Sequence, residues 1–494
     1  MIQNKKIFYL AVAVALAGVI TRHSNSIGLG DLFASLPSAT IWSGIAAALM
    51  ALSLIPFWSR SRPKKKVHTR RDNLKKEDLS AVADKVTVLS EADKPDIPYI
   101  VDYVIFQAIE AGASDIHFDP SRKGMDLRYR IQSMMINVVA IPNHLSSPIR
   151  NRLKVISNLV VYKHALPQDG RIDQNSGGNK HELERSGLAD SDFRIAFMPT
   201  LHGERIVIRI LGRGDDHLNF VELGMDDFEQ RTMERFLKQP QGMIILTGPT
   251  GSGKSTTIYA GLRNIQHQTH AVRSIATLED PIEFDLEGAN QSQVDEAKDF
   301  TFAMGLRAIL RQDPDVIMVG EIRDPKTAAI AIQAGMTGHL IITTVHAGST
   351  ASAFSRLLEM GVATYSLNSA VTAIIAQRLV RKICPNCKRE RGMTDHDKAD
   401  LNMATPPPGF SIFHGIGCEI CNNTGYHGRT ALFEMLEVNE NIRSLITDGA
   451  SVDKIREASK ESGMRTIWDA GLNAVKIGLT TPEEIARVVS KEDR

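Results

Sequence analysis

Ten residues at positions 248–257, GPTGSGKSTT, have the composition of a phosphate-binding loop. They fit the pattern G-x-x-x-x-G-K-[ST], in which glycines let backbone N–H groups turn inward around a polyphosphate. The pattern assigns Lys254 to the β- and γ-phosphates of a nucleoside triphosphate and the Ser255 hydroxyl to Mg²⁺. A purely structural glycine-rich turn would require strand, loop, Lys-Ser pair and helix to coincide by chance. The predicted nucleotide-binding residues are Gly248, Pro249, Thr250, Gly251, Ser252, Gly253, Lys254, Ser255 and Thr256.

Acidic residues and a histidine follow three apolar runs further along the chain. Glu279, Asp280 and Glu283 follow one run, Glu321 follows the next, and His346 ends the third. Carboxylates facing a phosphate site can hold metal-bound water or take the proton from an attacking water. A lone acidic cluster is usually a solvated loop and a lone histidine usually a core residue, but their order behind the phosphate-binding loop favours a catalytic role.

All four cysteines lie in two C-x-x-C pairs, Cys384 with Cys387 and Cys418 with Cys421. Two such pairs separated by a loop are typical of a structural Zn²⁺ site with four thiolate ligands. Disulfides would need an oxidising compartment, whereas an enzyme driven by a nucleoside triphosphate is expected in the cytosol. A redox site would need only one pair. We therefore predict a closed zinc site.

The elements that must position these residues alternate along the second half of the chain. Apolar runs at residues 243–246, 273–278, 316–319 and 340–345 are separated by helix-like segments. The alternation predicts a parallel sheet with crossover helices. Such sheets bind ligands at the carboxyl ends of their strands, where each of these runs ends in polar residues.

The composition is that of an ordinary soluble protein, with 494 residues, 43% of them hydrophobic, and a net charge of +1, which argues against a nucleic-acid coat protein. The N-terminus differs, because residues 7–20 and 41–58 are apolar and uncharged, with basic residues before the first run and after the second. The positive-inside rule predicts a membrane-spanning helical hairpin over residues 1–59 with both ends in the cytoplasm. There are two alternatives. Residues 1–20 could be a cleaved signal peptide, or the two runs could form a peripheral or buried apolar hairpin.

Four boxes resemble, in order, the motifs of secretion ATPases, and more narrowly those of the type II secretion and type IV pilus assembly branch. The loop at 248–257, EDPIE at 279–283, VGEIRD at 319–324 and GHLIITTVH at 338–346 are similar to the Walker A, Asp, Walker B and His boxes. The resemblance extends from about residue 96 to residue 478. It includes the cysteine pairs, which the assembly branch commonly carries and the pilus-retraction branch commonly lacks.

The resemblance implies roles for single residues. Glu283 is the candidate general base, Glu321 helps to hold Mg²⁺ through water, and His346 and His339 would sense the nucleotide or the adjoining subunit. Arginines in the upstream part also match the family.

Arg194 and Arg209 stand at positions whose guanidinium groups reach the γ-phosphate in this family. Alone, each would more simply be a surface arginine paired with a carboxylate. Two features depart from the family pattern. Gln132 and Ser133 replace its Asp-Gly turn, and the polar stretch 174–192 is longer than its usual connection.

The patterns and the resemblance together predict an α/β fold. A RecA-like P-loop ATPase domain covers residues 213–494, with the zinc insertion at about 384–421 and C-terminal helices. A small α/β, PAS-like domain with arginine fingers covers residues 95–212. A basic and polar linker at residues 60–94, partly helical around residues 75–89, joins it to the membrane hairpin.

The expected function is ATP hydrolysis, with Mg²⁺, by a membrane-anchored homo-hexamer at the cytoplasmic side of the bacterial inner membrane. The ring would act on a polytopic platform protein and, through it, on pilin-like subunits, with no direct nucleic-acid partner. One alternative is a DNA-uptake or conjugation-type translocation ATPase, which the tetracysteine unit and the absence of a recognisable DNA-binding module disfavour. The other is a structural scaffold with a degenerate nucleotide site, which Lys254, Ser255, Glu283 and Glu321 argue against.

Overall fold

The computed structural model describes residues 77–132, 134–172, 192–211, 219–269, 272–403, 405, 407 and 410–490. The predicted membrane hairpin and nearly all of the polar stretch 174–192 lie outside these ranges. Among the described helices, none combines the length and the apolar character that a membrane crossing needs.

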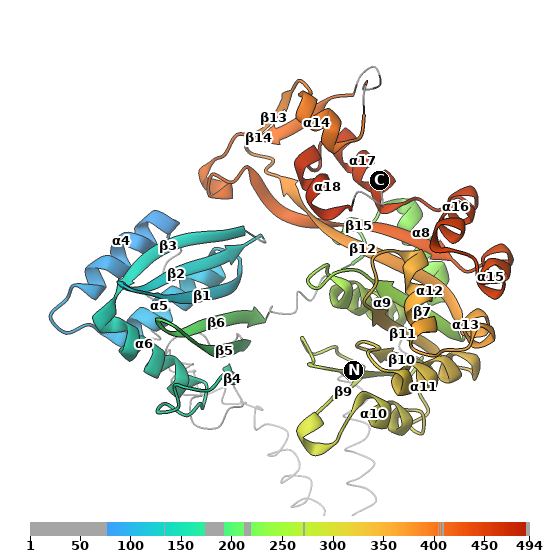
Figure 1. Ribbon diagram of the computed structural model, residues 1–494, viewed down its shortest axis with the longest axis horizontal. Helices are drawn as coiled ribbons and strands as arrows, with labels where there is room; N and C mark the ends of the chain where they lie inside the picture. Colours follow the sequence, from blue (N-terminus) through green and yellow to red (C-terminus); the bar gives the residue numbers. More distant parts are fainter. Residues whose placement is uncertain are drawn as a thin grey trace, which may run out of the picture. The chain divides into compact units, whose positions relative to one another are not determined.

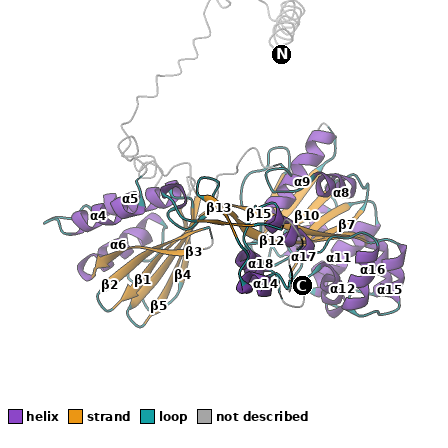
Figure 2. Ribbon diagram, turned by 90° about the horizontal axis from the view of Figure 1, so that it is seen from above, coloured by secondary structure: helices purple, strands orange, loops and turns teal. Residues whose placement is uncertain are grey.

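The first sheet (blue to green in Figure 1) has six antiparallel strands in the order β3-β2-β1-β6-β5-β4. Three helices cover one of its faces (Figure 2). Apolar side chains from both layers, among them Val104, Ile116 and Phe193, form a buried core. The helices are α4 (Leu79–Ser90), α5 (Ile97–Glu110) and α6 (Asn143–Ile156), and the strands are β1 (Ala113–Ser121), β2 (Gly124–Ile131), β3 (Met134–Pro142), β4 (Gln168–Ile172), β5 (Asp192–Thr200) and β6 (Gly203–Leu211).

Helix α4 lies in the segment 60–94, for which the polar sequence predicts a linker. Asp78 caps the helix by accepting a hydrogen bond from the backbone N of Ala81 at 2.7 Å. Val82 and Val86, one helical turn apart, are fully buried in the core of the first sheet. The linker interpretation is therefore wrong for residues 79–90, which are part of the packed layer.

The second sheet has seven strands in the order β15-β12-β7-β11-β10-β8-β9. All its neighbouring strands are parallel except β12 and β15. The four strands expected from the apolar runs are confirmed as β7, β8, β10 and β11, which are consecutive neighbours. The strands are β7 (Gly242–Thr247), β8 (Ile275–Glu279), β9 (Asn290–Gln293), β10 (Val316–Val319), β11 (Leu340–Val345), β12 (Val371–Ile383) and β15 (Tyr426–Glu437).

Helices pack on both faces of the second sheet, which explains why its central strands read as continuous apolar runs. On β7, Met243 and Ile245 face one core, while Ile244 and Leu246 face the other. The first core includes α10 (Phe302–Ile309), α11 (Pro325–Met336), α12 (Thr350–Glu359) and α13 (Thr364–Ala370). The second includes α8 (Asp227–Leu237) and α9 (Lys254–Gln268).

Strand β12 is longer than its parallel neighbour. It pairs with β7 only as far as Ala376, opposite Thr247, and continues to Ile383 as an antiparallel ribbon with β15. The cysteine pairs follow at the end of this ribbon, beside the hairpin of β13 (Lys388–Arg391) and β14 (Ile412–Gly415). The remaining elements are the 3-10 turns η3 (Glu296–Lys298) and η4 (Glu419–Cys421), and the helices α14 (Asp395–Asp400), α15 (Glu440–Thr447), α16 (Val452–Glu461), α17 (Ile467–Lys476) and α18 (Pro482–Val488).

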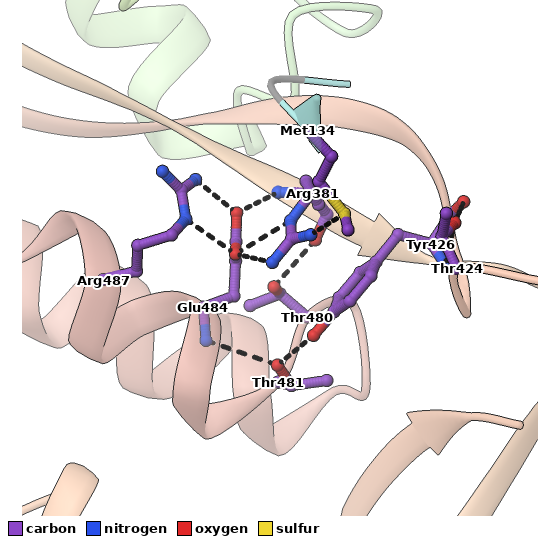
Figure 3. Close-up of polar contacts among 8 residues, drawn as sticks. All are labelled: Met134, Arg381, Thr424, Tyr426, Thr480, Thr481, Glu484 and Arg487. Atoms are coloured by element: carbon purple, nitrogen blue, oxygen red, sulfur yellow. Dashed lines mark hydrogen bonds and ion pairs between the residues drawn. The ribbon is translucent and has the colours of Figure 1, made fainter. Parts of the chain in front are cut away.

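Helix α18 is fastened to β12 by one buried carboxylate (Figure 3). Glu484 accepts hydrogen bonds from the backbone N of Arg381 at 3.0 Å and from its Nε at 2.9 Å. Arg487 donates to the same carboxylate through its Nε at 2.9 Å. The Glu484 side chain is fully buried, so two arginines compensate its charge where water cannot.

Candidate nucleotide and metal sites

The loop between β7 and α9 has a shape that three glycines make possible. The φ angles of Gly248, Gly251 and Gly253 are +143°, +76° and +86°, in the region that favours glycine. Gly253 is the N-cap of α9, so the unpaired N–H groups of the first helical turn open toward the loop. The loop and the helix N-terminus together form the arrangement that binds anions.

Lys254, the first residue of α9, folds back over this loop. Its Nζ donates to the carbonyl oxygens of Gly248 at 2.9 Å and Pro249 at 3.0 Å, and the residue is buried. Burial lowers the pKa of Lys254, the Glu321 carboxylate acts in the opposite direction, and the Arg378 guanidinium adds to the lowering. The ammonium therefore lies within the field of one charge that follows β10 and another on β12.

Glu321 and His346 meet at the same edge of the second sheet. Glu321 follows the end of β10, His346 follows the end of β11, and Glu321 Oε2 lies 3.3 Å from His346 Nε2. Arg323 donates to the other oxygen of Glu321. The parallel order of β7, β11 and β10 thus brings Lys254, Glu321 and His346 to one end of the sheet.

The acidic cluster after β8 is divided between two environments. Glu279 is buried and accepts hydrogen bonds from Thr277 Oγ1 at 2.6 Å, Gln291 Nε2 at 3.0 Å and the Tyr259 hydroxyl. Burial, together with that bond to Glu279, raises the pKa of Tyr259. Glu283, by contrast, is exposed on the loop beyond the strand. Glu283, like Asp280, therefore keeps its carboxylate open to solvent, whereas Glu279 does not.

Arg194 and Arg209 lie side by side on the first sheet, because they are directly paired residues of β5 and β6. The neighbouring residues Phe193 and Ile208 are buried under the helices, so the two arginines belong to the opposite face, which none of the described helices covers. Arg209 donates through its Nε to Asp115 at 3.0 Å, and its side chain remains 63% exposed.

His339 is separated from this group by the length of β11. It precedes the strand, where its Nδ1 lies 3.2 Å from the carbonyl oxygen of Ala334, whereas His346 follows the strand. Six strand residues at about 3.3 Å each put the two histidines roughly 20 Å apart. His339 therefore lies at the opposite end of β11 from His346, and its expected role in sensing the nucleotide or the adjoining subunit stays a prediction.

The four cysteines come together at the tip of the ribbon. The Sγ atoms of Cys384 and Cys418 are 3.8 Å apart, as are those of Cys387 and Cys421, and those of Cys418 and Cys421 are 3.7 Å apart. A tetrahedral Zn²⁺ with Zn–S bonds of about 2.3 Å requires S···S separations of about 3.8 Å. The donor set and its spacing therefore fit zinc.

The sequence reasoning missed Gln377 and Arg378 on β12. Gln377 is buried beside the glycine loop, and Arg378 donates to the carbonyl oxygens of Gln377 at 3.1 Å and of Gly348, two residues after His346. A polar pair inside the apolar sequence VTAIIAQRLV is the signal that could have identified them.

Comparison with known proteins agrees with this architecture. A family model described as "Type II/IV secretion system protein" matches residues 90–487. Type II secretion system protein E of Pseudomonas aeruginosa is 39% identical over 421 residues, which cover 84% of this chain and 80% of that protein. The type IV pilus assembly ATPase PilB of Myxococcus xanthus is 37% identical over 397 residues, which cover 80% and 68%.

Solved structures include proteins of the same fold. The pilus retraction motor PilT with bound ADP is 25% identical, with a TM-score of 0.51, and the match covers 80% of this chain and 98% of that chain. The Legionella pneumophila ATPase DotB shares the fold at 20% identity, with a TM-score of 0.57 and coverage of 80% and 97%. This chain therefore belongs to the type II/IV secretion system protein family and is an ATPase.

Proposed function

We propose that this chain hydrolyses ATP to drive assembly of type IV pili or of the pseudopili of type II secretion. The observation that carries the proposal is the meeting of Lys254, Glu321 and His346 at the N-terminus of α9 in a chain of this family. The chain would form a hexameric ring that acts on a polytopic platform protein of the inner membrane and moves pilin-like subunits. Residues 1–59 would anchor the ring as a helical hairpin.

At the nucleotide, Lys254 would contact the β- and γ-phosphates and the Ser255 hydroxyl would ligate Mg²⁺. Glu321 would hold water on the metal. Of the two glutamates in the acidic cluster, Glu283 is the better general base, because Glu279 already accepts hydrogen bonds from three side chains and is shielded from solvent.

The four thiolates would hold Zn²⁺ as a structural ion. All four ligand positions would be taken by sulfur, so the metal would fix the tip of the ribbon and would leave no coordination position for a substrate. The bound ion supplies folding free energy, because the unfolded chain does not hold four thiolates together.

The test combines hydrolysis with a cellular readout. Lys254→Ala should reduce ATP turnover at least about 100-fold, because it removes a charge that stabilises the transferring phosphoryl group. Cells carrying this variant in place of the wild type should lose pili or type II secretion. Lys298→Ala, which removes an exposed lysine whose ion pair among the described residues is with Asp295, is the matched control and should keep both activities.

Normal pilus assembly and secretion in the Lys254→Ala strain would refute the proposal. ATP turnover that is stimulated by DNA, with no export defect, would instead indicate a nucleic-acid translocase.

A further inference from the structure

Gln377 is a fully buried amide at the point where β12 passes the glycine loop. The preceding residue, Ala376, forms the last pair between β12 and β7, opposite Thr247, and the loop begins at Gly248. The Gln377 side chain therefore enters the space directly beneath the loop, and both of its polar atoms need partners there.

Both amide atoms bond to the loop and to its helix. The Gln377 Nε2 donates to the carbonyl oxygen of Ser252 at 2.8 Å, and the Oε1 accepts from the Thr257 hydroxyl at 2.9 Å. Ser252 lies two residues before Lys254, and Thr257 lies three residues after it. One side chain thus ties down the chain on both sides of the lysine.

The glycine loop also packs directly against this residue. A Cβ atom at Gly248 would lie 2.5 Å from the carbonyl oxygen of Gln377, and a Cβ at Gly253 would lie 2.9 Å from its Nε2. Both approaches are closer than a side chain permits, so the glycines allow the loop to rest on Gln377. The next residue, Arg378, bonds to Gly348 in the segment after His346.

We propose that Gln377 is a positioning residue of the nucleotide site, whose side-chain amide holds the glycine loop in the shape that receives phosphate oxygens. The proposal rests on the nucleotide site proposed above and adds to it a residue that touches no substrate atom. The proposed role requires the hydrogen-bond donor at Nε2 and the acceptor at Oε1. Substitutions can therefore change the hydrogen-bonding groups of the side chain while keeping its size.

Gln377→Glu keeps the shape and the acceptor but exchanges the donor for a second carboxylate oxygen facing the Ser252 carbonyl. Burial raises the pKa of such a carboxyl group, and its protonated form regains an O–H donor. The variant should bind a fluorescent ATP analogue roughly tenfold or more weakly than wild type at pH 8.5, the loss expected for an unsatisfied buried group. Its affinity relative to wild type should recover as the pH falls toward 6.

Gln377→Leu removes both polar atoms and should bind the analogue weakly at every pH. Gln266→Glu makes the same chemical change near the end of α9, where the amide of Gln266 bonds only to the Glu287 carbonyl among the described residues, and should match wild type. Lys254→Ala provides the non-binding reference. Thermal unfolding and zinc content of each full-length variant report whether the fold is retained.

Wild-type affinity in Gln377→Leu, or a weakened Gln377→Glu whose affinity relative to wild type is the same at all pH values, would overturn the positioning role. These results would leave the proposed function intact, because wild type would still bind the analogue and Lys254→Ala would not. Failure of wild type itself to bind would refute the nucleotide site instead.

Discussion

Glu279 and Glu283 are four residues apart in sequence, yet their carboxylates occupy different environments. Glu279 is enclosed by Tyr259, Thr277 and Gln291, while Glu283 faces solvent. A sequence pattern can place both after the same strand but cannot tell which one turns inward, because that depends on Gln291, twelve residues further on. The same limit applies to Gln377, whose partner Thr257 is 120 residues away.

The two environments predict different effects of the same substitution. Glu283→Gln should lower kcat by about 100-fold or more with a small change in KM, because only a proton acceptor is lost. Glu279→Gln should lower the melting temperature and leave kcat less affected than Glu283→Gln does. The reason is that it places an N–H donor among groups that themselves donate. Steady-state hydrolysis and thermal unfolding measure the two effects.

Glu287→Gln alters an exposed carboxylate of the same loop and serves as the control, with wild-type values expected for both. If Glu283→Gln turns over ATP at a rate near that of wild type, its assignment as the base is wrong.

At the scale of elements, the sequence predicted best those strands and helices that have a strong pattern of apolar residues. The four parallel strands are short runs of buried aliphatic residues, and the sequence identified each of them. It did not identify β9 (Asn290–Gln293), whose residues are all polar and whose place in the sheet depends on parallel pairing with β8. It placed α4 in a partly helical linker and missed its packing, because only Val82 and Val86 of that helix are fully buried apolar residues.

The attachment of α18 to β12 gives a prediction about stability. Burial raises the pKa of Glu484, but hydrogen bonds from Arg487 and Arg381 outweigh it, so the pKa lies below the ordinary value of a glutamate. A lowered pKa in the folded state means that the stabilisation is complete above the unfolded-state pKa and is lost as the pH falls below it. Glu484→Gln should therefore destabilise the protein by about 3 kcal/mol at pH 7.5, with two arginines left uncompensated.

The difference in stability between Glu484→Gln and wild type should become smaller as the pH approaches 4. Thermal unfolding followed across this pH range measures it, and Glu483→Gln, which changes an exposed neighbour, should behave as wild type. A Glu484→Gln protein with an unchanged melting temperature at pH 7.5 would show that the helix is held by its apolar contacts alone.

At the scale of the whole molecule, the feature to explain is the face of the first sheet that the described helices leave open. Arg194 and Arg209 lie on it, and the Arg209 side chain is 63% exposed despite its bond to Asp115. In the proposed hexamer, this face would supply positive charge to the nucleotide of another subunit.

Mixing of variant chains tests this arrangement. Arg194→Ala and Arg209→Ala should each abolish hydrolysis alone but regain part of it when mixed with Lys254→Ala chains, because mixed rings contain some sites with an intact lysine and intact arginines. Arg122→Ala, which changes an exposed turn residue, should be active alone. The absence of any recovery across mixing ratios, in rings shown to contain both variants by co-purification of differently tagged chains, would exclude action between subunits.

The ribbon of β12 and β15 has a mechanical consequence. From Gln377 to Ile383 it extends about 20 Å beyond the last pair with β7. The root of this extension, at Gln377, lies beneath the glycine loop. The clustered thiols lie at its far end, where the backbone N of Ile383 donates to the Leu479 carbonyl oxygen, and Glu484 holds it part of the way along. A sideways displacement of about 2 Å at the tip corresponds to a rotation of roughly 6° over that length. Force applied to the cysteine tip is thus delivered to the root as torque.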